Sequence, residues 1–78
     1  MAYTFDKVNT NGTWRVEVDT KENYGHFENQ VNGGGGGLWF VKENGLLVLE
    51  DYDGVFQLPT QVIDCLLEMD ILVDESFE

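Results

Sequence analysis

The stretch from Gly45 to Val73 constrains the fold more than any other part of the 78-residue chain. Leu46–Leu49 is an apolar run of the length and composition of a strand. Pro59 fixes a backbone angle that suits the first turn of a helix, and the hydroxyl of Thr60 is available as a cap. Beyond it, apolar residues recur at helical spacing: Val62, Ile63, Leu66, Leu67 and Met69. This pattern predicts a helix from about Thr60 to Met69. At roughly ten residues such a helix is too short to persist alone, so it must pack on a sheet.

Three earlier segments are predicted to be β-strands. Thr13–Asp19 alternates cleanly between apolar and polar residues, and Tyr24–Gln30 is a weaker strand candidate that carries Tyr24, His26 and Phe27. Leu38–Val41 is joined to Leu46–Leu49 by a turn that contains Asn-Gly, which predicts a hairpin. We therefore expect a single domain over residues 1–78 with an α+β fold. Its antiparallel sheet would have three to five strands, with one C-terminal helix packed on a face.

The two ends of the chain are less regular. Met1–Val8 contains one short alternation, compatible with an edge strand or with a leader held by its aromatic residues. Asn9–Gly12 is a strong turn sequence, because Asn-Gly supplies the positive φ angles of a two-residue hairpin loop. Ile71–Val73 is compatible with a terminal strand or a packed tail, and Asp74–Glu78 is expected to fray.

Five consecutive glycines, Gly33–Gly37, follow Val31 and Asn32. Ordering such a run costs more backbone entropy per residue than ordering any other sequence, and it has no side chains to pack. Residues 31–37 are therefore predicted to form a flexible loop. A glycine-rich loop that binds phosphate opens a helix and is joined by a lysine, whereas this run leads into the strand-like Leu38–Val41.

The charge composition limits the partners. Fifteen acidic residues against four basic ones give a formal net charge of -11. Such a surface repels nucleic acid and anionic membranes, and it attracts a positively charged groove on another protein. The single Cys65 cannot form an intramolecular disulfide, and the first residues lack the basic and apolar segments of a secretory signal. These features predict a cytoplasmic protein that does not enter a membrane.

Residues for catalysis or metal binding are scarce. The chain has one histidine, His26, and one cysteine, Cys65, which excludes a zinc cluster built from Cys and His. Asp51 and Asp53 begin an acidic turn, but Gly54 and the residues after it do not have the spacing of a calcium-binding loop. We therefore expect neither an enzyme nor a cofactor nor a bound metal.

Acidic residues are concentrated in the second half of the chain. Eight of them are predicted to bind a partner: Glu50, Asp51, Asp53, Asp64, Glu68, Asp70, Asp74 and Glu75. Strand and helix spacings place pairs of them roughly 5–7 Å apart, close to the spacing of neighbouring backbone phosphates. The alternative is that these charges only solubilise the protein, and that a partner binds an aromatic and aliphatic patch. That alternative patch would contain Trp39, Phe40, Tyr52 and Phe56.

Several segments resemble a group of small phage and prophage proteins. These segments are Tyr24–Glu28, Leu38–Phe40 after the glycines, Asp51–Pro59, Val62–Ile63 and Val73–Glu75. The resemblance implies that the protein is phage-borne. Small acidic phage proteins include inhibitors of the anti-CRISPR and anti-restriction types, which occupy nucleic-acid-binding sites.

Two functional hypotheses follow. In the first, the protein is an acidic phage inhibitor that mimics nucleic acid and occupies a basic groove of a host defence complex, without itself binding nucleic acid. In the second, it is a non-enzymatic interaction module or assembly subunit that binds through the aromatic patch. A homodimer joined through an exposed strand edge is compatible with either hypothesis.

Overall fold

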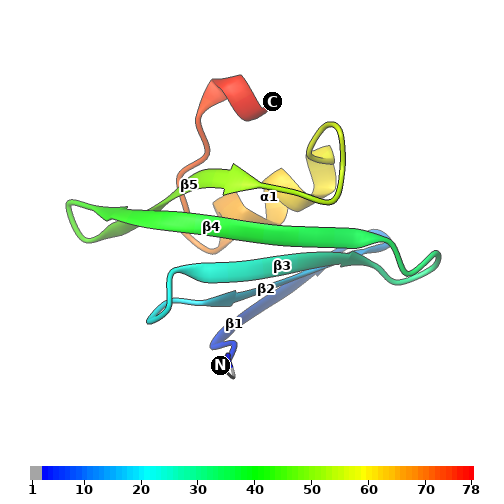
Figure 1. Ribbon diagram of the computed structural model, residues 1–78, viewed down its shortest axis with the longest axis horizontal. Helices are drawn as coiled ribbons and strands as arrows, with labels where there is room; N and C mark the ends of the chain where they lie inside the picture. The colour runs from blue at the N-terminus through cyan, green and yellow to red at the C-terminus, as the bar shows by residue number, and fades with distance from the viewer. Residues whose placement is uncertain (1–2) are drawn as a thin grey trace.

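Five antiparallel strands in chain order form the sheet, and one helix packs on it (Figure 1). The computed structural model describes residues 3–78. Its elements are β1 (Lys7–Asn11), β2 (Trp14–Asp19), β3 (Tyr24–Asn29), β4 (Gly35–Glu43), β5 (Leu46–Tyr52), the helix α1 (Thr60–Glu68) and the short 3-10 helix η1 (Glu75–Phe77). The predicted α+β fold with one C-terminal helix is confirmed.

The core lies between one face of the sheet and α1. Buried residues alternate along the strands, because successive side chains of a strand point to opposite faces. The sheet contributes Val16, Val18, Phe27, Leu38 and Phe40, and α1 contributes Val62, Ile63, Cys65 and Leu66. The helix lies against β1 and β2 and passes behind β5 in the view of Figure 1. The opposite face of the sheet, which we call the helix-free face, carries Tyr24, His26 and Trp39.

Tight turns connect the first and the last strand pairs. Asn44 and Gly45 both have positive φ angles, as expected for the predicted turn between β4 and β5. The predicted turn at Asn9–Gly12 begins too early, because β1 continues to Asn11 and only Gly12 and Thr13 turn the chain. The ladder of β1 and β2 extends to the pair Asn11 and Trp14, so the hydrogen bonds of the strand outweigh the local turn preference.

Both expectations for Met1–Val8 hold for a part of the segment: Lys7 and Val8 belong to β1, which is an edge strand of the sheet, and a leader precedes them. Met1 and Ala2 of the predicted Met1–Val8 segment lie outside the described residues. Tyr3 and Phe5 precede β1, and their rings lie 6.1 Å apart.

A lysine of a distant strand contacts the C-terminal end of α1. The last turn of the helix contains no basic residue, which leaves its carbonyl groups and dipole uncompensated within the helix itself. Nζ of Lys7 on β1 donates to the carbonyl oxygen of Met69 at 3.0 Å. At the other end, Pro59 is the N-cap residue and no side chain caps the helix, so Thr60 does not have the capping role expected for it.

The predicted flexible loop at residues 31–37 is shorter in the structure. Gly35, Gly36 and Gly37 belong to β4 and pair with β3. Gly35 and Gly36 need to be glycine because another backbone lies against each of them: a Cβ would overlap the carbonyl oxygen of Phe27 at Gly35 and that of Asp53 at Gly36. At Gly37 a Cβ would instead meet the indole of Trp39. The glycine run therefore allows close approach of two backbones, and only the residues before Gly35 form the turn.

The C-terminal segment returns to β5. Leu72 forms a single parallel bridge to Val48, whereas a full terminal strand was one expectation for Ile71–Val73. The residues that were expected to fray include η1, and the ring of Phe77 lies 5.8 Å from that of Tyr52. Within residues 3–78, no helix is long and apolar enough to cross a membrane.

Candidate functional site

The eight predicted acidic residues do not share one surface. Glu50 and Asp51 lie on β5 and Asp53 follows it; Asp64 and Glu68 lie on α1 and Asp70 follows it; Asp74 and Glu75 lie in the C-terminal segment. Because α1 packs on the face of the sheet that bears the core, its acids lie on the other side of the molecule from the helix-free face. The predicted acidic surface is therefore divided between two sides.

A β-bulge concentrates charge on β5. Phe40 pairs with Leu49 and Trp39 pairs with Asp51, so Glu50 is an extra residue without a partner in β4. Tyr52 returns to the side of Leu38, which leaves both Glu50 and Asp51 pointing away from the core and exposed. A regular strand would have placed two consecutive residues on opposite faces.

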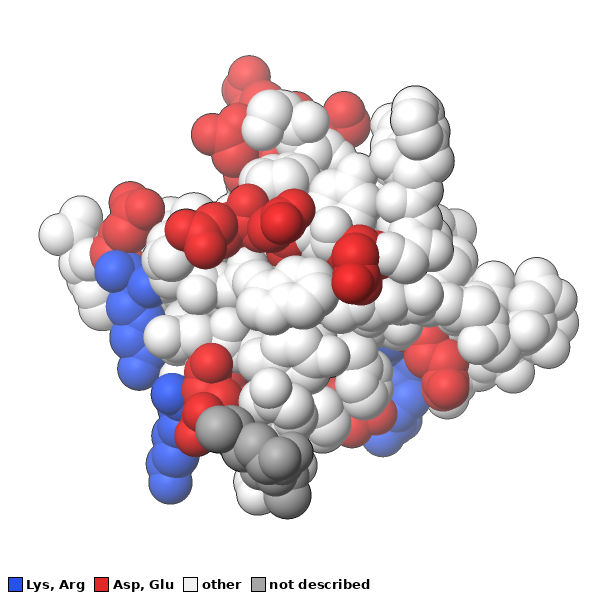
Figure 2. Space-filling model, in the orientation of Figure 1, with Lys and Arg blue, Asp and Glu red and all other residues white. Residues whose placement is uncertain are grey.

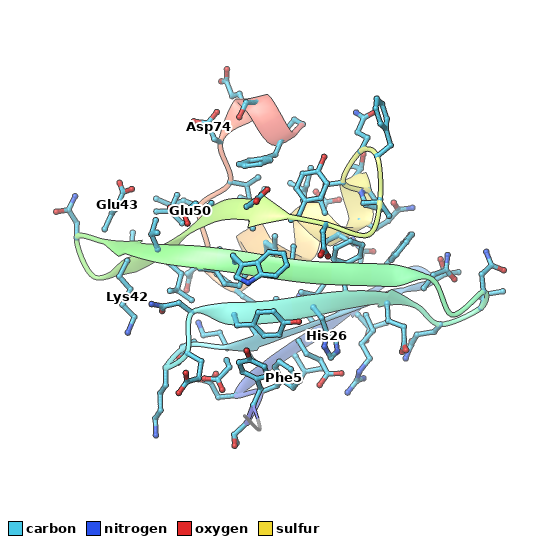
Figure 3. All side chains as sticks on the ribbon, in the orientation of Figure 1. Phe5, His26, Lys42, Glu43, Glu50 and Asp74 are labelled. Atoms are coloured by element: carbon cyan, nitrogen blue, oxygen red, sulfur yellow. The ribbon has the colours of Figure 1, made fainter. Side chains whose placement is uncertain are left out.

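Other carboxylates extend this charged surface. Figure 3 shows Glu43 and Glu50 along one side of the β4–β5 hairpin, with Asp74 beyond β5. We call Glu43, Glu50, Asp51 and Asp74 the acidic band. Figure 2 shows carboxylates gathered over β5 and the C-terminal segment, while lysine and arginine lie at the periphery of this face.

The acidic band is not neutralised by ion pairs within the described part of the chain. Among residues 3–78, the only carboxylate in an ion pair is that of Glu17, with Nε of Arg15 at 3.2 Å and Nε2 of His26 at 3.4 Å. The pKa of Asp74 is held below its ordinary value of 3.8, mainly because the backbone N–H of Ser76 donates to its carboxylate. Asp74 is therefore ionised at neutral pH.

Two of the predicted partner-binding acids connect segments that are far apart in the sequence. Oδ1 of Asp53 accepts the backbone N–H of Gly37 at 2.7 Å and so holds the end of β5 against the glycine run. Oε2 of Glu68 accepts the side-chain amide of Asn9 at 2.6 Å and connects α1 to β1. Reversing the charge of either residue would disturb the fold as well as the surface.

The predicted aromatic patch does not exist as one surface. Phe40 is 4% exposed and belongs to the core, so its assignment to a binding patch was wrong. Trp39 precedes it on β4 and is 38% exposed on the helix-free face. Tyr52 is half-buried on the side of the core, and its hydroxyl donates to the carbonyl oxygen of Phe56. Phe56 is 99% exposed in the loop before α1.

A different aromatic cluster lies on the helix-free face. We call it the aromatic strip; it contains Tyr3, Phe5, Tyr24, His26 and Trp39. The ring of Tyr3 stacks on Tyr24 at 4.3 Å, and Tyr24 meets Trp39 edge to face at 5.7 Å. Phe5 meets His26 at 4.7 Å, and Figure 3 shows these two side by side. The alternation of Tyr24, His26 and Trp39 with buried residues was visible in the sequence, but the pairing of β3 with β4 was not.

A single buried carboxylate, which the sequence did not indicate, holds the turn between β2 and β3. Asp19 is 4% exposed, and its carboxylate accepts three backbone N–H groups, from Thr4, Lys21 and Glu22. A cavity of about 250 Å³ borders this turn. Because the carboxylate of Asp19 is fully hydrogen-bonded, its contacts fix the turn and the leader.

His26 and Cys65 cannot act together. Cys65 is buried on the side of α1 that faces the sheet, and burial, followed by the charges of Glu68 and Asp64, raises the pKa of its thiol above the ordinary value of 9.0. His26 lies on the opposite side of the sheet, next to Glu17. Across residues 3–78, no group of three or more His, Cys, Asp or Glu side chains is placed to hold a metal ion.

No protein-family model matches this chain, and neither does any curated protein or solved structure. The resemblance to phage proteins therefore stays a prediction. On the helix-free face, the acidic band lies beside Trp39 of the aromatic strip, which pairs with Asp51.

Proposed function

We propose that the protein is a phage-encoded, non-enzymatic inhibitor that acts in the host cell cytoplasm. Its acidic band occupies a basic groove in which a CRISPR or restriction complex normally binds nucleic acid. Of the eight predicted residues, the proposal keeps Glu50, Asp51 and Asp74, and it adds Glu43 of β4. It leaves out Asp64, Glu68 and Asp70 on the side of the helix, together with Asp53 and Glu75.

The observation that carries the proposal is the bulge at Glu50. It places two carboxylates, Glu50 and Asp51, side by side on an exposed surface, and no lysine or arginine of residues 3–78 forms an ion pair with them. Adjacent like charges repel each other and contribute nothing to the stability of the strand. A groove that binds nucleic acid is lined by cations, and these cations would also attract the carboxylates of Glu50 and Asp51.

The test compares two charge reversals in phage infection. Strains that each carry one CRISPR or restriction system are infected with a sensitive phage, with and without expression of the protein. We expect the wild-type protein to restore plaque formation on at least one strain. Glu50→Lys should lower this inhibition at least about tenfold, because a like charge opposes the basic groove. Asp64→Lys makes the same change of charge on the exposed side of α1 and should inhibit as the wild type does.

The inhibited complex allows a second measurement. Purified protein should displace nucleic acid from the complex. The displacement should weaken as salt rises from about 50 to about 500 mM, because this shortens the Debye length from about 14 Å to about 4 Å and screens exposed charges. Equal inhibition by wild type and Glu50→Lys would contradict the proposal. Equal loss in Glu50→Lys and Asp64→Lys would show that net charge, and not the acidic band, is responsible.

The second hypothesis, an interaction module that binds through apolar contacts, is supported by the two exposed aromatic residues Trp39 and Phe56. It predicts the opposite dependence on salt. Affinity for the partner should hold at high salt, because burial of apolar surface is not screened.

A further inference from the structure

Trp39 is the end of the aromatic strip that lies next to β5. Its indole is held from two sides: Tyr24 meets it edge to face at 5.7 Å, and its outer ring lies over Gly37, where a Cβ would come within 2.8 Å of indole Cη2. The side chain is nevertheless 38% exposed. Trp39 is thus an oriented aromatic surface in contact with solvent, and its neighbours restrict its movement.

Carboxylates border this indole. Asp51 is the direct partner of Trp39 across the ladder of β4 and β5, so their Cβ atoms are neighbours on the helix-free face. Glu50 is exposed next to Asp51 because of the bulge. One oxygen of Asp51 accepts the backbone N–H of Tyr52, which orients the carboxylate and leaves its second oxygen for another donor.

We infer that Trp39, Asp51 and Glu50 bind an arginine side chain of the partner protein. A guanidinium group stacks on an aromatic ring and at the same time donates paired hydrogen bonds to a carboxylate. The indole of Trp39 offers the ring, and the second carboxylate oxygen of Asp51 offers a hydrogen-bond acceptor. This inference rests on the proposed function, because a groove that binds nucleic acid is lined by arginine and lysine, and it assigns the aromatic contact that the acidic band alone would lack.

The charge of this surface favours an arginine of a basic protein over a second copy of the chain or nucleic acid. A second copy of the chain would bring its own net charge of -11 to the same surface, and its single arginine, Arg15, is already paired with Glu17. Nucleic acid would be repelled by Asp51 and Glu50. An arginine-bearing segment of a basic protein complements both the charge and the ring.

The test uses three synthetic peptides with four repeats of glycine followed by arginine, lysine or citrulline. Citrulline has nearly the shape of arginine but no charge. Binding to the intact protein is measured by calorimetry at low salt and by the NMR shift of the Trp39 indole N–H. We expect the arginine peptide to bind most tightly, the lysine peptide less tightly and the citrulline peptide not at all.

Variants separate the ring from the charge. Trp39→Leu should weaken the arginine peptide about five- to thirtyfold, the range that a partly desolvated cation–π contact supports, and should weaken the lysine peptide less. Phe56→Leu removes a ring that is 99% exposed outside the strip and should change nothing. Asp51→Asn keeps an oxygen for the backbone N–H of Tyr52, so it preserves the fold and should weaken the arginine peptide as well.

The outcomes distinguish this inference from the proposed function. If Trp39→Leu binds the arginine peptide as tightly as the wild type, or if arginine and lysine peptides bind equally, the arginine site is refuted. Inhibition of a defence complex that still depends on Glu50 would then leave the proposed function standing. If Trp39→Leu proves too unstable to assay, unchanged binding in Asp51→Asn refutes the site by itself.

Discussion

Replacing Gly36 by alanine tests why the glycine run exists. A Cβ at this position would overlap the carbonyl oxygen of Asp53 and lie 2.6 Å from its carbonyl carbon, and both are backbone atoms that cannot rotate away. The segment after β5 would have to move from β4. That movement would also break the hydrogen bond from the backbone N–H of Gly37 to Asp53.

The expected loss is a large share of the stability of this domain. Forcing a methyl group into a packed contact costs about 1–3 kcal/mol, and the loss of a hydrogen bond to a carboxylate brings Gly36→Ala to about 2–4 kcal/mol. A chain of 78 residues has a free energy of unfolding of about 4–12 kcal/mol. At about 4–8 °C for each kcal/mol, the melting temperature should fall by at least roughly 8 °C.

Gly34→Ala is the matched control. It makes the same change two residues earlier, where no atom lies within 4 Å of the added Cβ and the φ angle is not positive. Alanine there should leave the free energy of unfolding unchanged or raise it by about 0.4–1 kcal/mol, because it restricts the unfolded chain. Urea unfolding followed by circular dichroism gives both values. If the two variants unfold within about 0.5 kcal/mol of each other, the close approach of β4 and Asp53 does not explain the glycine.

Three further predictions concern other parts of the fold. Lys7→Met removes the ammonium group that donates to Met69 at the end of α1 and should lower the free energy of unfolding by about 1 kcal/mol in a urea titration; no change would refute this role. The pKa of Asp6 lies below its ordinary 3.8 because Thr20 donates a backbone N–H and its hydroxyl to the carboxylate. The contribution of Asp6 to the free energy of unfolding is complete above pH 3.8 and is lost as pH falls through the lower pKa of the folded state. In Asp6→Asn, the free energy of unfolding should therefore fall less between neutral and acid pH than in the wild type. Cys65 has a raised thiol pKa and is buried, so a thiol reagent should label it slowly in the native protein and rapidly in denaturant; rapid native labelling would place it at the surface.

The sequence predicted most elements because their signals are local. The alternation in Thr13–Asp19 and the apolar runs on both sides of Asn44 and Gly45 depend on neighbouring residues alone, and β2, β4 and β5 follow them. The helix was predicted to within one residue, since its apolar spacing and Pro59 mark the same segment. The glycine run was wrongly assigned for the same reason. Its local entropy favours a loop, whereas a contact with residues some distance along the chain makes Gly35–Gly37 a strand.

The candidate site was less predictable because it depends on strand register. Phe40 and Trp39 are consecutive and similarly apolar, and only the pairing of β4 with both neighbours decides which of them faces solvent. The charge of Glu50 and Asp51 was evident, but the bulge that turns both outward is a property of the pair of strands. Spacing along the helix could not show that Asp64 lies on the other side of the molecule.

The segment after the bulge divides its residues between surface and fold, which makes the two separable by mutation. Glu50 and the free oxygen of Asp51 point to solvent, Tyr52 packs toward Phe77, and Asp53 accepts the N–H of Gly37. A substitution at Glu50 should therefore alter binding without altering stability, whereas a substitution at Asp53 should lower stability. If both substitutions changed inhibition and stability in proportion, the loss of inhibition would follow from unfolding, and the acidic band would be needed for neither recognition nor competition with nucleic acid.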